Sequence, residues 1–131
     1  MERARKSETI FMKILIVDDS MAMRKIVART LRQAGFDDIE IVEAENGQAG
    51  LEAVSSHEPD VILSDWNMPV MNGIDFLKAL RAGDDSRPFG FITTEGGADM
   101  RRQAIEAGAD FLLEKPCTAE QVASKLSSYT K

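Results

Sequence analysis

Five short apolar runs recur along the chain, and longer segments with helical periodicity separate them. The first and third runs are almost entirely aliphatic, which is typical of central strands in a parallel sheet covered on both faces. The runs that predict strands are Lys13–Val17, Ile39–Glu43, Val61–Ser64, Phe89–Thr93 and Asp110–Leu113.

The segments between these runs place apolar side chains three or four residues apart, which predicts amphipathic helices. Ser20, Asn46 and Thr118 stand where N-caps are expected, and Gly35 and Gly108 stand where helices should end. The apolar stripes expected to face inward are Met23, Ile26, Val27, Thr30 and Leu31; Ala49, Leu51 and Val54; Phe76, Leu77 and Leu80; and Met100, Ala104 and Ile105. In the last segment, the side chains that share one side are Val122, Lys125, Leu126 and Tyr129.

Strict alternation of strands and helices with short links predicts an α/β fold of the (βα)₅ type. Such a fold has a parallel sheet, helices on both faces and right-handed crossovers. The 131 residues suffice for one domain, which we place at residues 12–131 with no effector domain after it. Residues 1–11 lack the apolar centre of a signal peptide, so we interpret them as a disordered leader or tag.

Composition narrows the class of protein. An apolar fraction of 44% and a charged fraction of 29% are typical of a soluble globular protein, here expected to be a monomer. The net charge of −6 argues against a nucleic-acid or anionic-membrane surface, which would reward positive charge. Cys117 is the only cysteine, and no apolar run approaches the roughly 18 residues of a membrane span. A reducing, cytoplasmic location is therefore the simpler interpretation.

Polar residues with chemical potential follow four of the five predicted strands. Asp18 and Asp19 follow the first strand, Asp65 the third, Thr93 ends the fourth and Lys115 follows the fifth. In a doubly wound parallel sheet, ligands bind beyond the carboxyl ends of the strands. Each residue alone could be an ordinary polar residue at a strand end, but their convergence on one edge favours a site.

Close carboxylates require compensation. Two of them about 5 Å apart repel by roughly 3 kcal/mol at an effective dielectric near 20, so we expect a bound cation or a raised carboxyl pKa. Hard oxygen ligands on separate loops favour Mg²⁺. Such an ion could hold a phosphoryl group against a carboxylate nucleophile, which would form an aspartyl-phosphate. Lys115 and Thr93 would then supply a countercharge and a hydroxyl donor.

At this point the chain resembles the response-regulator receiver (CheY-like) family over about residues 13–129. The motifs that carry the resemblance are LIVDDS (Leu15–Ser20), SDWNMPVMNG (Ser64–Gly73), ITTE (Ile92–Glu95) and EKP (Glu114–Pro116). The second motif is the most specific, and its DWNMP segment is similar to the chemotaxis type. The resemblance implies a flavodoxin-like, doubly wound sandwich with the strand order 2-1-3-4-5.

The resemblance also implies roles for individual residues. Asp65 would be the phosphoacceptor, and the acidic pair Asp18 and Asp19 would hold Mg²⁺. The direct protein ligands would be Asp19, Asp65 and the backbone carbonyl of Asn67. Thr93 and Lys115 would contact the phosphoryl group, and the Lys115-Pro116 peptide would be cis. The positions that would tune dephosphorylation are Asn67, Thr94 and Glu95.

One departure from the family pattern bears on function. The family usually places an aromatic residue three positions before the lysine, where this chain has Leu112. Phe111 should face the other side of the sheet and cannot simply replace it. The aromatic switch is therefore in doubt, and with it docking to a flagellar switch protein.

The resemblance implies phosphotransfer from a CheA-like histidine kinase, partner binding on the face made by the fourth helix, fifth strand and fifth helix, and a phosphatase as a further partner. Leu112 favours the alternative of a phosphate sink or a phosphorelay intermediate. A haloacid-dehalogenase-like phosphohydrolase would need an Asp-x-Asp pattern after the first strand. A flavodoxin-like FMN binder would need a phosphate loop there, which the adjacent Asp18 and Asp19 would repel.

Overall fold

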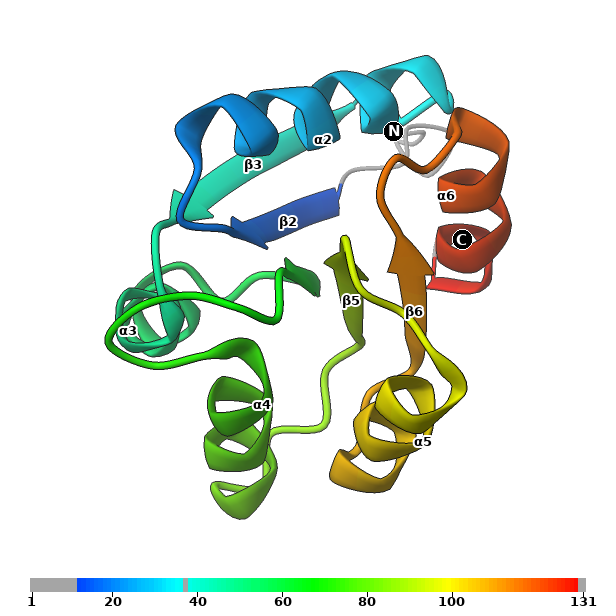
Figure 1. Ribbon diagram of the computed structural model, residues 1–131. Helices are drawn as coiled ribbons and strands as arrows, with labels where there is room; N and C mark the ends of the chain where they lie inside the picture. The colour runs from blue at the N-terminus through cyan, green and yellow to red at the C-terminus, as the bar shows by residue number, and fades with distance from the viewer. Residues whose placement is uncertain (1–11, 37, 130–131) are drawn as a thin grey trace.

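The computed structural model describes residues 12–36 and 38–129, in which strands and helices alternate along the chain (Figure 1). The predicted leader at residues 1–11 lies outside the described residues. The elements are β2 (Met12–Val17), α2 (Met21–Gln33), β3 (Ile39–Ala44), α3 (Gly47–His57), β4 (Val61–Ser64), α4 (Gly73–Ala82), β5 (Phe89–Thr93), α5 (Ala98–Ala107), β6 (Phe111–Glu114), α6 (Ala119–Leu126) and the 3₁₀ turn η1 (Ser127–Tyr129).

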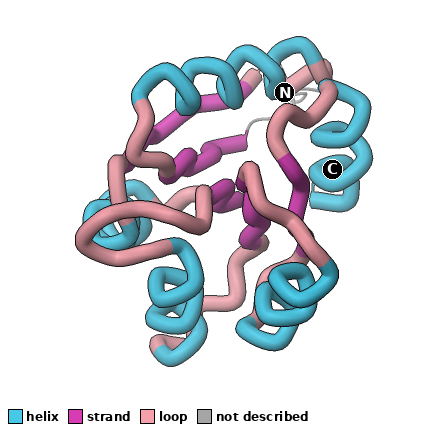
Figure 2. The backbone as a smooth tube through the Cα atoms, in the orientation of Figure 1, coloured by secondary structure: helices cyan, strands magenta, loops and turns pink. Residues whose placement is uncertain are grey.

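The strands form one parallel sheet of five strands in the order β3-β2-β4-β5-β6. Counted along the chain this is the order 2-1-3-4-5, so the predicted flavodoxin-like fold is confirmed. From β2 the chain passes to β3 on one side and then to β4 on the other, which opens a crevice beyond the carboxyl ends of β2 and β4. Figure 2 shows loops gathered around this edge of the central strands.

The core divides into two layers, because successive strand residues point to opposite faces. Leu15, Ile62 and Phe91 pack on the side of α3, α4 and α5, whereas Ile16 and Leu63 pack on the side of α2 and α6. Figure 1 shows these two groups of helices on opposite sides of the sheet. The rings of Phe76, Phe89 and Phe91 meet edge to face in the first layer.

The predicted caps are confirmed. Side chains of Ser20 and Asn46 accept hydrogen bonds from the first turns of α2 and α3, and Thr118 forms a capping box with Gln121. Gly108 ends α5 in the left-handed conformation, with φ of 107°. The sequence analysis missed Asn72, whose side chain accepts from the amide of Asp75 and caps α4.

Two predictions of buried helix positions were wrong. Ile26 is 47% exposed and Ile105 is 51% exposed. The apolar stripe of each helix is wider than the face that meets the sheet. In α2 the buried positions are Val27, Ala28 and Leu31, and in α5 only Ala104 is buried.

Three predicted strands differ by one residue from the observed ones. The first strand begins at Met12, the second extends to Ala44, and the last runs over Phe111–Glu114. Asp110 lies just before that last strand, where its carboxylate accepts a hydrogen bond from the amide of Phe89 at 2.9 Å. Within the described parts of the chain, no helix combines the length and apolar character that crossing a membrane requires.

Candidate functional site

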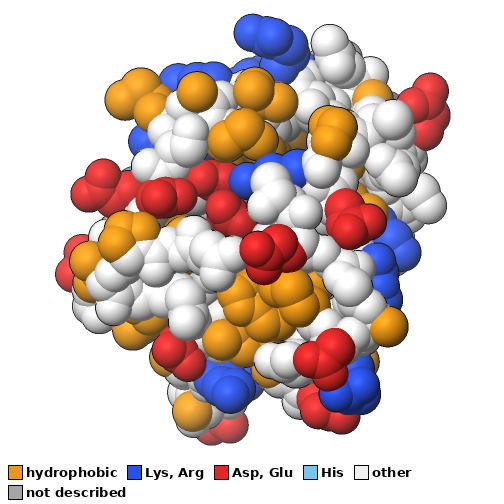
Figure 3. Space-filling model, viewed as in Figure 1, with side chains coloured by type: hydrophobic (Ala, Val, Ile, Leu, Met, Phe, Trp, Pro, Cys, Tyr) orange, Lys and Arg blue, Asp and Glu red, His pale blue; other side chains and the backbone are white. Residues whose placement is uncertain are grey.

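The three aspartates meet at the carboxyl edge of the sheet. Asp18 and Asp19 follow β2, and Asp65 follows β4. One carboxylate oxygen from each of the three lies within 4.8 Å of the others. Asp18 is buried, Asp65 is half-buried and Asp19 is exposed, so the cluster opens to solvent on the side of Asp19. Figure 3 shows acidic side chains bordering a basic one near the middle of the face in view.

Lys115 is the cation that faces this cluster. Its Nζ lies 2.7 Å from Oδ2 of Asp18 and 3.4 Å from Oδ2 of Asp65. The lysine side chain is only 7% exposed, so the pairing takes place largely away from water. The backbone amide of Lys115 donates to the carbonyl of Thr93 at 2.7 Å, and the Lys115-Pro116 peptide is cis. The hydrogen bond to the end of β5 thus holds the lysine, which follows β6, beside the aspartates.

Backbone hydrogen bonds fix the carboxylates of Asp18 and Asp65. The amide of Asp65 donates to the carbonyl of Val17 at 2.8 Å, which joins the ends of β4 and β2. Oδ1 of Asp65 accepts from the amide of Trp66 at 2.7 Å, and Oδ1 of Asp18 accepts from the amide of Ser20 at 2.9 Å. In each of these carboxylates one oxygen is held by the backbone, and the other faces Lys115.

The surroundings of Asp65 disfavour the ionised form of its carboxyl group. Burial raises the pKa of this carboxyl group, and the charge of Asp18 raises it further. Lys115 and the Trp66 amide lower the same pKa, but they do not offset burial, and the pKa stays above its ordinary value. A cation among the aspartates would stabilise the ionised form. Three carboxylates on two loops are also hard oxygen donors of the kind that Mg²⁺ prefers, so the residues fit this ion.

Gly73 allows α4 to begin directly against this site. Its amide donates to the carbonyl of Trp66 at 2.8 Å. A Cβ atom at this position would lie 2.2 Å from the carbonyl oxygen of Asp65 and 2.8 Å from the ring of Phe91. Only glycine fits this close approach without a shift of the backbone that carries Asp65.

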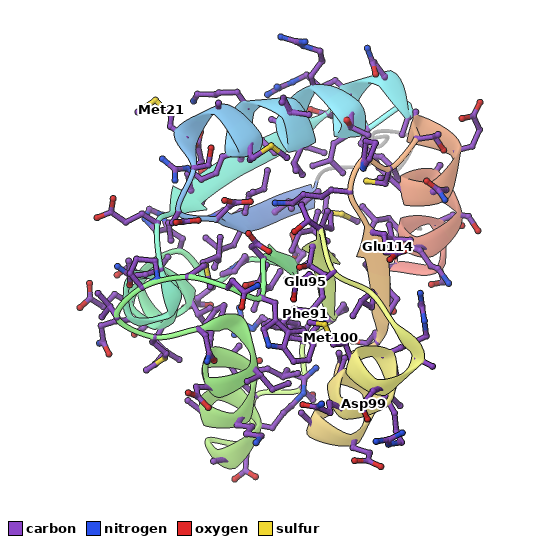
Figure 4. All side chains as sticks on the ribbon, viewed as in Figure 1. Met21, Phe91, Glu95, Asp99, Met100 and Glu114 are labelled. Atoms are coloured by element: carbon purple, nitrogen blue, oxygen red, sulfur yellow. The ribbon has the colours of Figure 1, made fainter. Side chains whose placement is uncertain are left out.

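The remaining predicted site residues surround the cluster. Thr93 is fully buried at the end of β5, and its hydroxyl oxygen lies 3.4 Å from the amide of Glu95, which donates to it. Asn67, Thr94 and Glu95 are exposed in the loops after β4 and β5. In Figure 4, Glu95 lies in the loop between β5 and α5, near this edge of the sheet.

Leu112 is 1% exposed and packs in the layer of α3, α4 and α5. Its neighbour Phe111 lies in the layer of α2 and α6 and covers Gly90, where a Cβ would come within 2.1 Å of the phenylalanine ring. The two side chains therefore face opposite sides of the sheet, as the sequence indicated. The carbonyl of Leu112 accepts from Nη1 of Arg101 at 2.9 Å, which ties α5 to β6.

Sequence reasoning missed Arg24, which hydrogen-bonds to the backbone of the acidic loop after β2. Its Nη1 donates to the backbone carbonyl of Asp18 at 2.5 Å, and its Nε donates to Oε1 of Glu43 at 2.7 Å. Lys25 also binds Glu43, at 2.7 Å, and hydrogen bonds from Lys25 and Arg24 lower the pKa of that carboxyl group. A basic residue so near the start of a helix opposes the helix dipole, and this was the available signal.

Comparison with known proteins identifies the family of this chain. The model of the response regulator receiver domain matches residues 14–127. The chain belongs to the response regulator receiver family. This receiver is 40% identical over 118 residues to the chemotaxis protein CheY1 of Helicobacter pylori, with 88% of this chain and 94% of that protein covered. It is also 40% identical over 117 residues to the chemotaxis protein CheY-3 of Vibrio cholerae, with 88% of each covered.

A solved structure supports the same assignment. The chemotaxis response regulator CheY4 of Vibrio cholerae superposes on this receiver with a TM-score of 0.78 at 34% identity, covering 91% of this chain and 98% of that one. Receiver domains bind Mg²⁺ at an acidic pocket, and the three aspartates form such a cluster here. A CheY-like receiver implies a histidine kinase as its partner and an output target. Membership of this family leaves the phosphohydrolase and FMN-binding alternatives without support.

Proposed function

We propose that this receiver is a chemotaxis-type response regulator in which Asp65 accepts a phosphoryl group from a histidine kinase. Mg²⁺ would be held by Asp18, Asp19 and Asp65, with the backbone carbonyl of Asn67 as a further ligand. The observation that carries this proposal is the geometry at the sheet edge. Three carboxylates lie within 4.8 Å of one another, and the Lys115 ammonium stands 2.7 Å and 3.4 Å from two of them.

The chemistry follows from these groups. An electron pair of the Asp65 carboxylate forms a new P–O bond while the P–N bond of the phosphohistidine breaks, and the imidazole nitrogen keeps the bonding pair. When bound, Mg²⁺ supplies neutralisation of the charge on the phosphoryl oxygens. Lys115 would contact the same oxygens, and the Thr93 hydroxyl would serve as a donor from the neighbouring strand end.

Release of phosphate completes the cycle. Water attacks the phosphorus of the aspartyl-phosphate, the P–O bond to Asp65 breaks, and inorganic phosphate leaves. Asn67, Thr94 and Glu95 are exposed at the rim, where they can reach an incoming water or a phosphatase. We assign the tuning of this hydrolysis to them. Phosphorylation and hydrolysis are thus chemistry of the receiver itself, and the receiver is a phosphoacceptor rather than an enzyme acting on a separate substrate.

The output surface would be the face of α5, β6 and α6. Charge added at Asp65 would shift a two-state equilibrium that this face reports to a partner. Relatives named as chemotaxis proteins support a CheA-like kinase and a flagellar switch protein as partners. The buried Leu112, in place of an aromatic side chain, supports the second candidate, a phosphate sink or phosphorelay intermediate. We propose a cytoplasmic monomer in either case.

Trp66 provides the test of the acceptor. Its amide donates to Oδ1 of Asp65, and its ring packs on Phe91 with centroids 4.8 Å apart. Adding Mg²⁺ with beryllofluoride, a phosphoryl mimic, should change the fluorescence of Trp66. Asp65→Asn should abolish that change while leaving the far-ultraviolet circular dichroism intact. A full fluorescence response in Asp65→Asn would overturn the assignment of the acceptor.

The two output candidates need a separate experiment. The beryllofluoride form should capture a flagellar switch protein if the receiver acts on the motor. If the receiver is a phosphate sink, it should instead accept phosphoryl groups from a CheA-like kinase and capture no flagellar switch protein. Phosphotransfer in both cases must be lost in Asp65→Asn.

A further inference from the structure

Arg24 joins two segments that lie far apart in the sequence. It is the fourth residue of α2, and its side chain is 12% exposed. One arm of its guanidinium group donates to the carbonyl of Asp18, and the other binds Glu43 at the end of β3. The first turn of α2 contains no acidic residue. A cation near this end of a helix is unfavourable on dipole grounds, so the contacts of Arg24 must outweigh that cost.

The carbonyl that Arg24 binds belongs to the peptide unit between Asp18 and Asp19. The amide of Asp18 is held separately, since it donates to the carbonyl of Ala44 at 3.0 Å. This segment is therefore fixed from the β3 side and from α2. Among the residues that the structure describes, no hydrogen bond to the exposed carboxylate of Asp19 is found. Its direction consequently depends on how the adjoining peptide is held.

Glu43 holds the second contact of the Arg24 guanidinium group. Nε of Arg24 lies 2.7 Å from Oε1 of Glu43, while Nη1 of the same group donates to the carbonyl of Asp18. Hydrogen bonds from Lys25 and Arg24 lower the pKa of Glu43, which shows that both cations stabilise its ionised form. Lys25 shares Glu43 at 2.7 Å, but no contact links it to Asp18.

We propose that Arg24, tethered by Glu43, is a positioning residue that preorganises the Asp18-Asp19 peptide for Mg²⁺. This inference rests on the proposed function, because it assumes that the aspartates bind this ion. Groups behind the direct ligands of a metal commonly change its affinity by about 10- to 100-fold. Arg24 would act in this way through the backbone rather than through a ligand side chain.

The direction of the change in Mg²⁺ affinity distinguishes a positioning role of Arg24 from a purely electrostatic effect of its charge. Removing a positive charge beside an acidic site should, on Coulomb grounds, strengthen the binding of a cation. If Arg24 positions the loop, its removal should weaken binding instead. Lys25→Ala is the matched control. It also removes one positive charge that pairs with Glu43, but it leaves the hydrogen bond to the carbonyl of Asp18 in place.

The experiment is a titration with Mg²⁺ alone, monitored by the fluorescence of Trp66. Arg24→Ala should raise the dissociation constant for Mg²⁺ about tenfold, and Glu43→Gln should raise it by a smaller factor. Lys25→Ala should leave it unchanged or lower it. Arg24→Lys should recover only part of the affinity, because one ammonium lacks the planar fork that contacts both partners. The beryllofluoride response at saturating Mg²⁺ should keep its full amplitude.

Melting curves in EDTA identify any variant that fails to fold, and Arg24→Lys and Glu43→Gln then provide the test. Equal Mg²⁺ affinity in the wild type and these variants would overturn the role of Arg24. An equal loss in Lys25→Ala would also overturn it, since the effect would then follow charge or general stability. Absence of Mg²⁺ binding in the wild-type protein would instead contradict the proposed function.

Discussion

At the scale of single residues, Asp65 carries a charge that its surroundings oppose. Burial, aided by Asp18, raises the pKa of this carboxyl above the ordinary 3.8. The folded state therefore holds the proton more tightly than the unfolded chain does. The resulting contribution to stability is present below pH 3.8 and is lost as the pH rises through the raised pKa. At neutral pH without a divalent ion, the ionised Asp65 destabilises the fold.

Asp65→Asn should consequently increase the free energy of unfolding at pH 7 in EDTA. The gain should shrink as the pH is lowered through the raised pKa of Asp65, because the wild-type carboxyl then becomes neutral as well. Urea unfolding at pH 7 and at a series of lower pH values measures the difference. Glu52→Gln, at an exposed position of α3, is the control and should change little at pH 7. A less stable Asp65→Asn variant at pH 7 would show that Lys115 outweighs burial.

At the scale of elements, the start of α4 and the loop after β4 depend on the absence of a side chain at Gly73. Gly73→Ala would place a Cβ 2.2 Å from the carbonyl oxygen of Asp65. Overpacking of this kind costs about 1–3 kcal/mol, and the shift should also weaken the beryllofluoride response. Gly83→Ala, at the other end of α4, would place its Cβ 3.6 Å from the carbonyl oxygen of Leu80, an ordinary contact, and should be nearly neutral. Urea unfolding of the two variants compares them directly, and equal stability would contradict the crowding at Gly73.

Much of the arrangement of elements is predictable because it depends on local patterns. The strands follow from aliphatic runs and the caps from Ser20, Asn46 and Thr118. The exposed Ile26 and Ile105 were not predictable, because the buried side of a helix is decided by the sheet and helices beside it. The hydrogen bond from the amide of Phe89 in β5 to the carboxylate of Asp110, just before β6, joins residues 21 positions apart and was not predictable from a local pattern either.

The candidate site likewise contains some contacts that the sequence predicts and others that it does not. Asp18, Asp65 and Lys115 could be brought together from sequence because each follows a strand of a parallel sheet, and all carboxyl ends of such strands share one edge. The contacts of Arg24 could not be predicted in this way. Glu43 lies 19 positions along the chain, and only the packing of α2 beside β3 brings the two together.

At the scale of the whole molecule, the two ends of the sheet use charge differently. At the end opposite the aspartates, arginines close the loops against the backbone. Arg81 donates to the carbonyls of Gly108, Asp85 and Arg87, and Arg87 donates to the carbonyl of Pro59. The carboxyl end instead gathers three aspartates around one lysine. Arginine hydrogen bonds thus close one end, while the other end retains a carboxylate repulsion that a cation can relieve.

Mg²⁺ should therefore stabilise the whole receiver, because the aspartates come together only in the folded chain. At ten times its dissociation constant, an ion that binds only the folded state adds about 1.4 kcal/mol. For a domain of this size that raises the melting temperature by about 5 °C. Thermal unfolding in EDTA and in increasing Mg²⁺ measures the shift, and Asp19→Asn, which removes an exposed ligand, should reduce it. Identical melting curves with and without Mg²⁺ would contradict the metal site, because an ion bound to the folded state alone must shift the unfolding equilibrium.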